Sequence, residues 1–112
     1  MSARGTHLWV AQRVTAMILG VAVLVHLGTI LVAVRGGLSA PEIVARIGGN
    51  EAWLLFYIVF ALAAGLHGAI GLRSIAAEWL GWRGRRFDLA WLGIGLLTAL
   101  FGIAAAAGLY AA

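Results

Sequence analysis

The order of apolar and polar positions divides the chain into three long apolar segments. The first runs from about residue 9 to 34, the second from 52 to 79 with no charge before Arg73, and the third, 89–110, carries no charge. A helix rises about 1.5 Å per residue and the hydrocarbon core of a bilayer is about 30 Å thick, so each segment is long enough to cross it. The pattern predicts an all-α membrane protein with three transmembrane helices in one domain, residues 1–112.

The connection between the first two segments carries its own helix signals. Pro41 follows Ser39-Ala40, and its fixed φ suits the first turn of a helix, where Glu42 lies near the positive end of the helix dipole. Gly48-Gly49 is a typical stop. We therefore predict a short amphipathic helix over 41–47 that lies on the membrane surface.

Composition agrees with the membrane assignment. Hydrophobic residues make up 63% of the chain and charged residues 11%, whereas a soluble domain has about 25% charged residues. The mean hydropathy is +1.02. Cysteine is absent from the sequence, so neither a disulfide nor a thiolate ligand for iron or zinc is available within this chain.

The arginines predict the orientation, because cytoplasmic connections carry the excess of positive charge. Most lie near the amino terminus or around the second connection: Arg4, Arg13, Arg73, Arg83, Arg85 and Arg86. Arg35 and Arg46, in the first connection, are balanced by two glutamates. We therefore expect the amino terminus in the cytoplasm and the carboxyl terminus outside. The net charge of +4 is then topological, and no nucleic-acid partner is expected.

Two histidines lie within apolar segments, where ionisable groups are expensive and usually face a partner, a cavity or a cofactor. His67 lies near mid-membrane among alanines and glycines that let a flat group approach the backbone. His26 lies within the first segment, and counting residues places it only several ångströms nearer the outer surface. One interpretation is helix packing with an interhelical hydrogen bond. The other is haem, because neutral imidazole is a good axial ligand, and the presence of two such histidines favours haem.

The stretch QRVTAMILGVAVLVH, followed by LHGAIGLRSIAAEW, resembles the membrane-anchor (cytochrome b) subunits of the succinate dehydrogenase and fumarate reductase family. In that family an Arg followed by Ser/Thr opens the first span, and a second-span histidine precedes a Gly-containing turn and an acidic-aromatic pair. The resemblance covers the first two spans. It implies a subunit of the bacterial inner membrane that joins a second membrane subunit, binds one or two haems b with it, and docks an iron-sulfur subunit and a flavoprotein subunit on the cytoplasmic face.

Residue by residue, the resemblance makes His67 the second-span haem ligand. Glu78 and Trp79 match the acidic-aromatic pair near the quinone, and Arg13 and Thr15 match the first-span feature. His26 departs from single-haem anchors, although di-haem members have a ligand there. It is expected to hold a second haem or to pair with a histidine of the partner.

Ser74 and Glu78 return to the face of His67 on a 3.6-residue helix, and form a polar column toward the cytoplasmic end. Quinone reduction consumes two protons, so this column, with Arg13, Thr15 and Trp79, predicts a quinone site there. Arg73 and Arg13 are alternatively partners of haem propionates. The competing interpretation makes Arg73, Glu78 and Trp79 ordinary anchors at the membrane interface.

The catalytic chemistry is expected to belong to partner chains, because the sequence has neither a Rossmann-type glycine pattern nor a cysteine cluster. Two other functions stay open at this stage. One is a haem-free structural anchor or assembly subunit, in which the histidines only pack. The other is a small proton-pathway subunit that uses His26 and His67.

Overall fold

A computed structural model describes residues 2–37 and 39–112, and every regular element in these ranges is a helix. Three helices are long: α1 spans Ala3–Gly36, α3 spans Glu51–Leu80 and α4 spans Arg85–Ala111. Each is long and apolar enough to cross a membrane. The predicted all-α fold with three membrane-spanning helices is confirmed.

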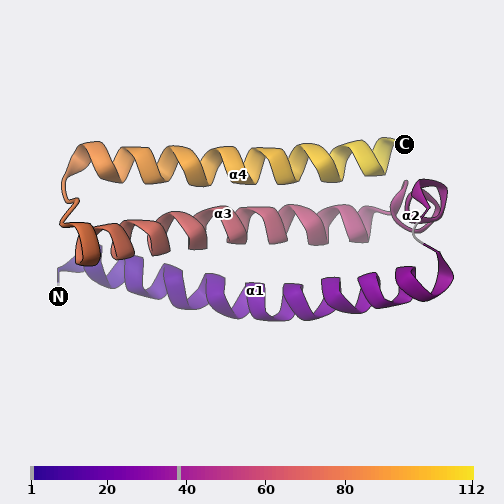
Figure 1. Cartoon of the computed structure of the whole chain (residues 1–112), viewed down its shortest axis with the longest axis horizontal. Coiled ribbons are helices and arrows are strands. Elements are labelled where there is room, and N and C mark those ends of the chain that lie inside the picture. Colours follow the sequence, from indigo (N-terminus) through magenta and orange to yellow (C-terminus); the bar gives the residue numbers. More distant parts are fainter. Residues whose placement is uncertain (1, 38) are drawn as a thin grey trace.

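The three long helices run antiparallel to their neighbours, with α3 between α1 and α4 (Figure 1). The short helix α2, Ala40–Ile47, follows α1 and is seen almost end-on, so it lies roughly perpendicular to the others (Figure 1). That orientation suits a helix in the plane of a membrane surface. The predicted helix in the first connection is therefore confirmed, with its start one residue earlier.

Polar caps and a left-handed glycine set the helix ends. The Ser2 hydroxyl accepts a hydrogen bond from the Gly5 N–H at 3.0 Å, and the Asn50 side chain accepts from the Trp53 N–H at 3.2 Å. Gly81 ends α3 with a φ of 69°, which glycine adopts without steric cost. Because Ser2 caps α1 well outside the apolar segment, α1 begins six residues before the predicted span.

Small residues form the interior of the bundle. Gly65 of α3 and Gly95 of α4 face each other so closely that a Cβ at Gly65 would collide with the Gly95 carbonyl oxygen. A Cβ at Gly95 would lie 2.6 Å from the Gly65 carbonyl oxygen and 2.8 Å from the Cβ of Ala69. Such positions let two helix backbones approach and gain dispersion contacts in lipid. The buried apolar positions are Ala22, Ala63, Ala69, Ile70, Ala76, Ala99 and Ala106.

Large apolar side chains lie on the outside instead. Phe101 is 75% exposed and Leu24 is 70% exposed, and most of the other exposed apolar residues are leucine, valine or isoleucine. An apolar surface of this extent is unfavourable in water. It is the surface expected where lipid tails surround a helical bundle.

Candidate functional site

His67 contacts a hydroxyl group of the neighbouring helix. Its Nδ1 atom lies 3.2 Å from Oγ1 of Thr15. The Thr15 residue is only 5% exposed, and His67 is half-buried. The structure therefore brings together two predicted site residues, one from α1 and one from α3, in the interior of the bundle.

His26 makes a second contact between the same two helices. Its Nδ1 atom lies 3.3 Å from the hydroxyl oxygen of Tyr57. The rings of Tyr57 and Phe60 meet the imidazole edge-on, each with its centroid 5.7 Å away. An imidazole in this position is held by aromatic edges and one polar bond.

The two histidines lie at clearly different depths. Thr15 marks the level of His67 on α1, and His26 lies 11 residues further along that helix, which is about 16 Å at 1.5 Å per residue. The expected separation of only several ångströms is therefore wrong. The expectation counted residues from the start of the apolar segment, at about residue 9. The helix itself begins six residues earlier, at Ala3, so His26 lies further along it than expected. One haem iron cannot take both histidines of this chain as axial ligands.

A cavity of about 260 Å³ lies between α1 and α3, at the end of the bundle where α1 begins and α3 ends. Two predicted site residues, Arg73 and Ser74, line it beside Gln12 and Trp9. The Oε1 atom of Gln12 is buried, and no hydrogen-bond partner is found for it among the described residues. An unpaired buried acceptor is costly, so Gln12 stands out among the residues that line the cavity. Sequence reasoning missed Gln12, although it is a polar residue in an apolar segment, one turn before Thr15.

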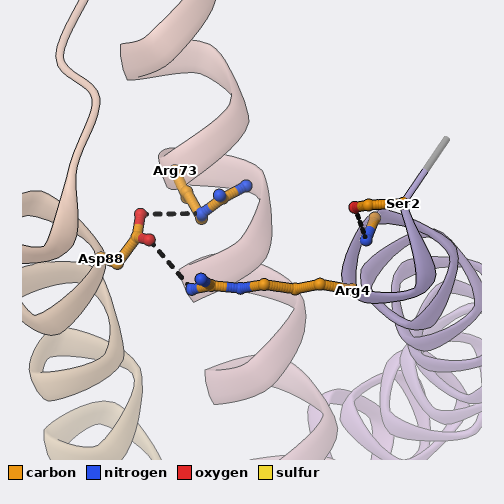
Figure 2. A network of polar contacts seen from close by, with 5 residues as sticks. Ser2, Arg4, Arg73 and Asp88 are labelled. Carbon is orange, nitrogen blue, oxygen red and sulfur yellow. Dashed lines mark hydrogen bonds and ion pairs between the residues drawn. The ribbon is translucent and has the colours of Figure 1, made fainter.

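Arg73 is committed to an ion pair that the sequence did not predict. Its Nε donates to Oδ1 of Asp88 at 2.8 Å, and Nη2 of Arg4 donates to Oδ2 of the same carboxylate at 3.1 Å (Figure 2). This cluster links α1, α3 and α4 at one end. Asp88, and not a carboxylate of α3, is therefore the partner of Arg73. The available signal was that Asp88, the sole aspartate of the chain, follows the basic stretch RGRRF.

The predicted quinone residues lie at the same end of the bundle. The guanidinium carbon of Arg13 lies 5.1 Å from the centroid of the Trp9 ring, and Arg13 is exposed. Two residues correspond to about 200° around a helix, so Arg13 lies almost opposite Thr15 on α1. Glu78 is exposed, and Trp79 is 82% exposed. Arg13 and Thr15 therefore face different sides of α1, and their shared role at a quinone stays a prediction.

The polar column on α3 becomes more exposed toward the end of the helix. His67 and Ser74 are half-buried, and Glu78 is exposed. The column therefore runs from the interior of the bundle to its surface.

A larger cavity of about 500 Å³ lies toward the opposite end of the bundle, the end that carries α2. All four helices line it, and its polar lining includes His26, Tyr57 and Arg46. His67 is not among the lining residues. Sequence reasoning missed this cavity, because its lining residues come from four helices that are separate in the sequence.

These features define a three-helix membrane protein with an imidazole held in its interior by a neighbouring hydroxyl. A family model described as succinate dehydrogenase/fumarate reductase transmembrane subunit matches residues 2–103. The chain belongs to this family. Comparisons with curated proteins and with solved structures gave no significant match.

Proposed function

We propose that the chain is the haem-b-bearing anchor subunit of a succinate:quinone or quinol:fumarate oxidoreductase, seated in the bacterial inner membrane. In this proposal it passes electrons between an iron-sulfur partner and quinone, and has no complete activity alone. Membership in the family supports the anchor role. The observation that carries the haem assignment is the contact of the His67 ring with buried Thr15, because it fixes an imidazole at bilayer depth.

The residues around His67 fit a haem group. A Cβ added to the adjoining Gly68 would meet no atom within 4 Å, so the backbone beside the imidazole is open to a flat ligand. Bound haem supplies one-electron exchange between ferrous and ferric iron. The second axial ligand comes, in this proposal, from the second membrane subunit, because His26 lies about 16 Å along the bundle. We therefore propose one haem, held by His67, and Arg73 is neutralised by Asp88.

The quinone site belongs, in this proposal, to the end of the bundle that holds the smaller cavity. Reduction of a quinone takes two electrons and two protons. Gln12 and Ser74 line this cavity, and their amide and hydroxyl groups are of the kinds that hydrogen-bond to a quinone or quinol. Exposed Glu78 exchanges protons with water, and exposed Trp79 offers an aromatic surface to the ring or to the iron-sulfur subunit.

The distribution of charge supports a cytoplasmic position for that end. Five arginines lie where α1 begins, where α3 ends or where α4 begins: Arg4, Arg73, Arg83, Arg85 and Arg86. The opposite end has Arg35 and Arg46 together with Glu42 and Glu51. The positive-inside rule then favours an amino terminus in the cytoplasm, on the side where the iron-sulfur and flavoprotein subunits dock.

The haem assignment is tested on the complex purified from membranes. A reduced-minus-oxidised spectrum of the wild type is expected to show a b-type α-band, and His67→Ala is expected to abolish it or convert the centre to high spin. His7→Ala is the matched control, because His7 is exposed near the start of α1 and should leave the band unchanged. An unchanged low-spin band in His67→Ala would exclude this ligand, and a haem-free wild type would leave a structural anchor.

A further inference from the structure

The Thr15 hydroxyl has three polar neighbours and one hydrogen to share among them. Its Oγ1 atom lies 2.7 Å from the carbonyl oxygen of Ala11, 3.1 Å from that of Gln12 and 3.2 Å from Nδ1 of His67. A hydroxyl donates one hydrogen bond and accepts through two lone pairs, whereas a carbonyl oxygen only accepts. The hydrogen is therefore committed to the α1 backbone, and lone pairs of Oγ1 are left for the imidazole.

This arrangement decides which nitrogen of His67 carries the proton. A lone pair of Thr15 Oγ1 attracts Nδ1 at 3.2 Å only if Nδ1 bears a hydrogen. In a neutral imidazole the other nitrogen, Nε2, then holds an unshared lone pair. Because Thr15 is buried, the opposite tautomer would set two lone pairs against each other away from water, which is costly.

We propose that Thr15 is a positioning residue that holds His67 as the Nδ1–H tautomer and so presents Nε2 to the haem iron. The inference rests on the proposed haem function and adds a specific role for the hydroxyl. A hydrogen bond from Nδ1–H also makes Nε2 a stronger donor to the metal, which favours ferric over ferrous iron. Thr15 therefore lowers the midpoint potential of the haem as well as orienting its ligand.

The polar contact of His26, the second intramembrane histidine, does not fix its tautomer. Nδ1 of His26 faces the phenol of Tyr57, and a phenol both donates and accepts. That contact is compatible with either tautomer of His26. The committed hydroxyl at Thr15 is what distinguishes the two imidazoles.

The chain offers a matched control for removal of a helical hydroxyl. Thr98 donates to the carbonyl oxygen of Ile94 at 2.9 Å, the same backbone bond that Thr15 makes within its own helix, but it is exposed on α4. Thr→Val keeps the shape of the side chain and removes the hydroxyl in both cases. A general effect of losing this bond should therefore appear equally at both positions.

The first experiment compares Thr15→Val, Thr15→Ser and Thr98→Val in the assembled complex. Haem per complex, the midpoint potential and the low-spin electron paramagnetic resonance signal are measured. Thr15→Val is expected to lower haem affinity about 10- to 100-fold and to raise the potential of the haem that remains. Thr15→Ser should restore both quantities, and Thr98→Val should change neither.

Three results would overturn the proposal. The first is Thr15→Val with the affinity, potential and signal of the wild type. The second is an equal loss in Thr98→Val. The third is Thr15→Ser behaving like Thr15→Val, which would assign the effect to packing of the threonine methyl group.

A second measurement needs no haem and separates this inference from the proposed function. Solid-state ¹⁵N spectra of the histidine-labelled chain in lipid bilayers distinguish protonated from unprotonated ring nitrogens, and His67→Ala identifies the His67 signals. The wild type should show Nδ1 protonated and Nε2 bare, and Thr15→Val should lose this preference. A dominant Nε2–H tautomer in the wild type would refute the positioning role. The expected tautomer in a complex without haem would refute only the haem assignment.

Discussion

The two sides of α3 differ in what they tolerate and in what they offer. Gly65 and Ala69 meet α4, and an added Cβ at the facing Gly95 has no room. His67 lies two residues after Gly65 and projects about 200° away from it around the helix, and Ser74 lies five residues after Ala69 and projects about 140° away from it. Both are beside residues of α1. One side is closed by backbone contact and the other keeps polar side chains beside a cavity.

The comparison shows how one helix separates close backbone packing on one side from polar contacts on the other. The α4 side gains its stability from dispersion between close backbones, which requires only small residues. The α1 side is held by a few polar contacts, so it leaves imidazole and hydroxyl groups able to meet a ligand. Substitutions on the two sides should therefore fail in different ways.

The largest effect is expected from a large side chain placed where α3 packs closely against α4. Gly95→Leu should separate α3 from α4, because its Cβ would start 2.6 Å from the Gly65 carbonyl oxygen. Overpacking of this kind costs about 1–3 kcal/mol or more, and loss of the assembled subunit from membranes is expected. Gly93→Leu is the control, since nothing lies within 4 Å of a Cβ there. Equal amounts of both variants in the membrane would show that the close approach is not required.

A large effect on electron transfer to quinone, without loss of assembly, is expected from Glu78, on the face of α3 that also carries His67 and Ser74. Glu78→Gln removes a carboxylate that exchanges protons, and should slow electron transfer to quinone by about 10²-fold. Transfer to a soluble dye that takes electrons from the flavoprotein should hardly change. Arg13→Leu tests the other predicted residue in the same assay, and Glu51→Gln, at the far end of α3, is the charge control. Unchanged quinone turnover and inhibitor sensitivity in both test variants would place the site elsewhere.

The sequence predicts the elements of this fold well because each depends on local properties. Apolar length predicts the three spans, and Pro41 with Gly48-Gly49 predicts α2 almost to the residue. His67 also stands out locally, as an ionisable residue among glycines and alanines, and its role as a haem ligand stays a prediction. These signals need no knowledge of which helix lies beside which.

What the sequence could not predict is the register between helices. The Thr15–His67 contact joins positions 52 residues apart, and it depends on α1 beginning outside the apolar segment. The same shift widens the separation between the levels of His26 and His67 from the expected several ångströms to about 16 Å. Asp88 was overlooked for a similar reason, because its two arginine partners come from other helices.

A moderate effect on stability is expected from the ion-pair cluster of Arg4, Arg73 and Asp88, at one end of the bundle. Asp88→Asn leaves Arg4 and Arg73 without a full countercharge and should lower stability by about 1 kcal/mol. Of the two partners, Arg73→Gln should cost more than Arg4→Gln, because the side chains are 36% and 73% exposed. Thermal unfolding in detergent at low and high salt measures this, and the differences should shrink as salt screens the charges. The reverse order of the two arginine variants would contradict the assignment.

The smallest effect on haem content is expected from substitution of His26. This prediction tests whether the complex holds one haem or two. His26 lies about 16 Å from the level of His67 and bonds to Tyr57, so His26→Ala should leave the haem content and the α-band of the complex unchanged. The cost should be limited to stability, at about 1 kcal/mol for the lost hydrogen bond and ring contacts. Tyr57→Phe removes only the hydroxyl and should cost less. Loss of about half the haem in His26→Ala, with none in Tyr57→Phe, would instead establish a second haem beside the 500 Å³ cavity.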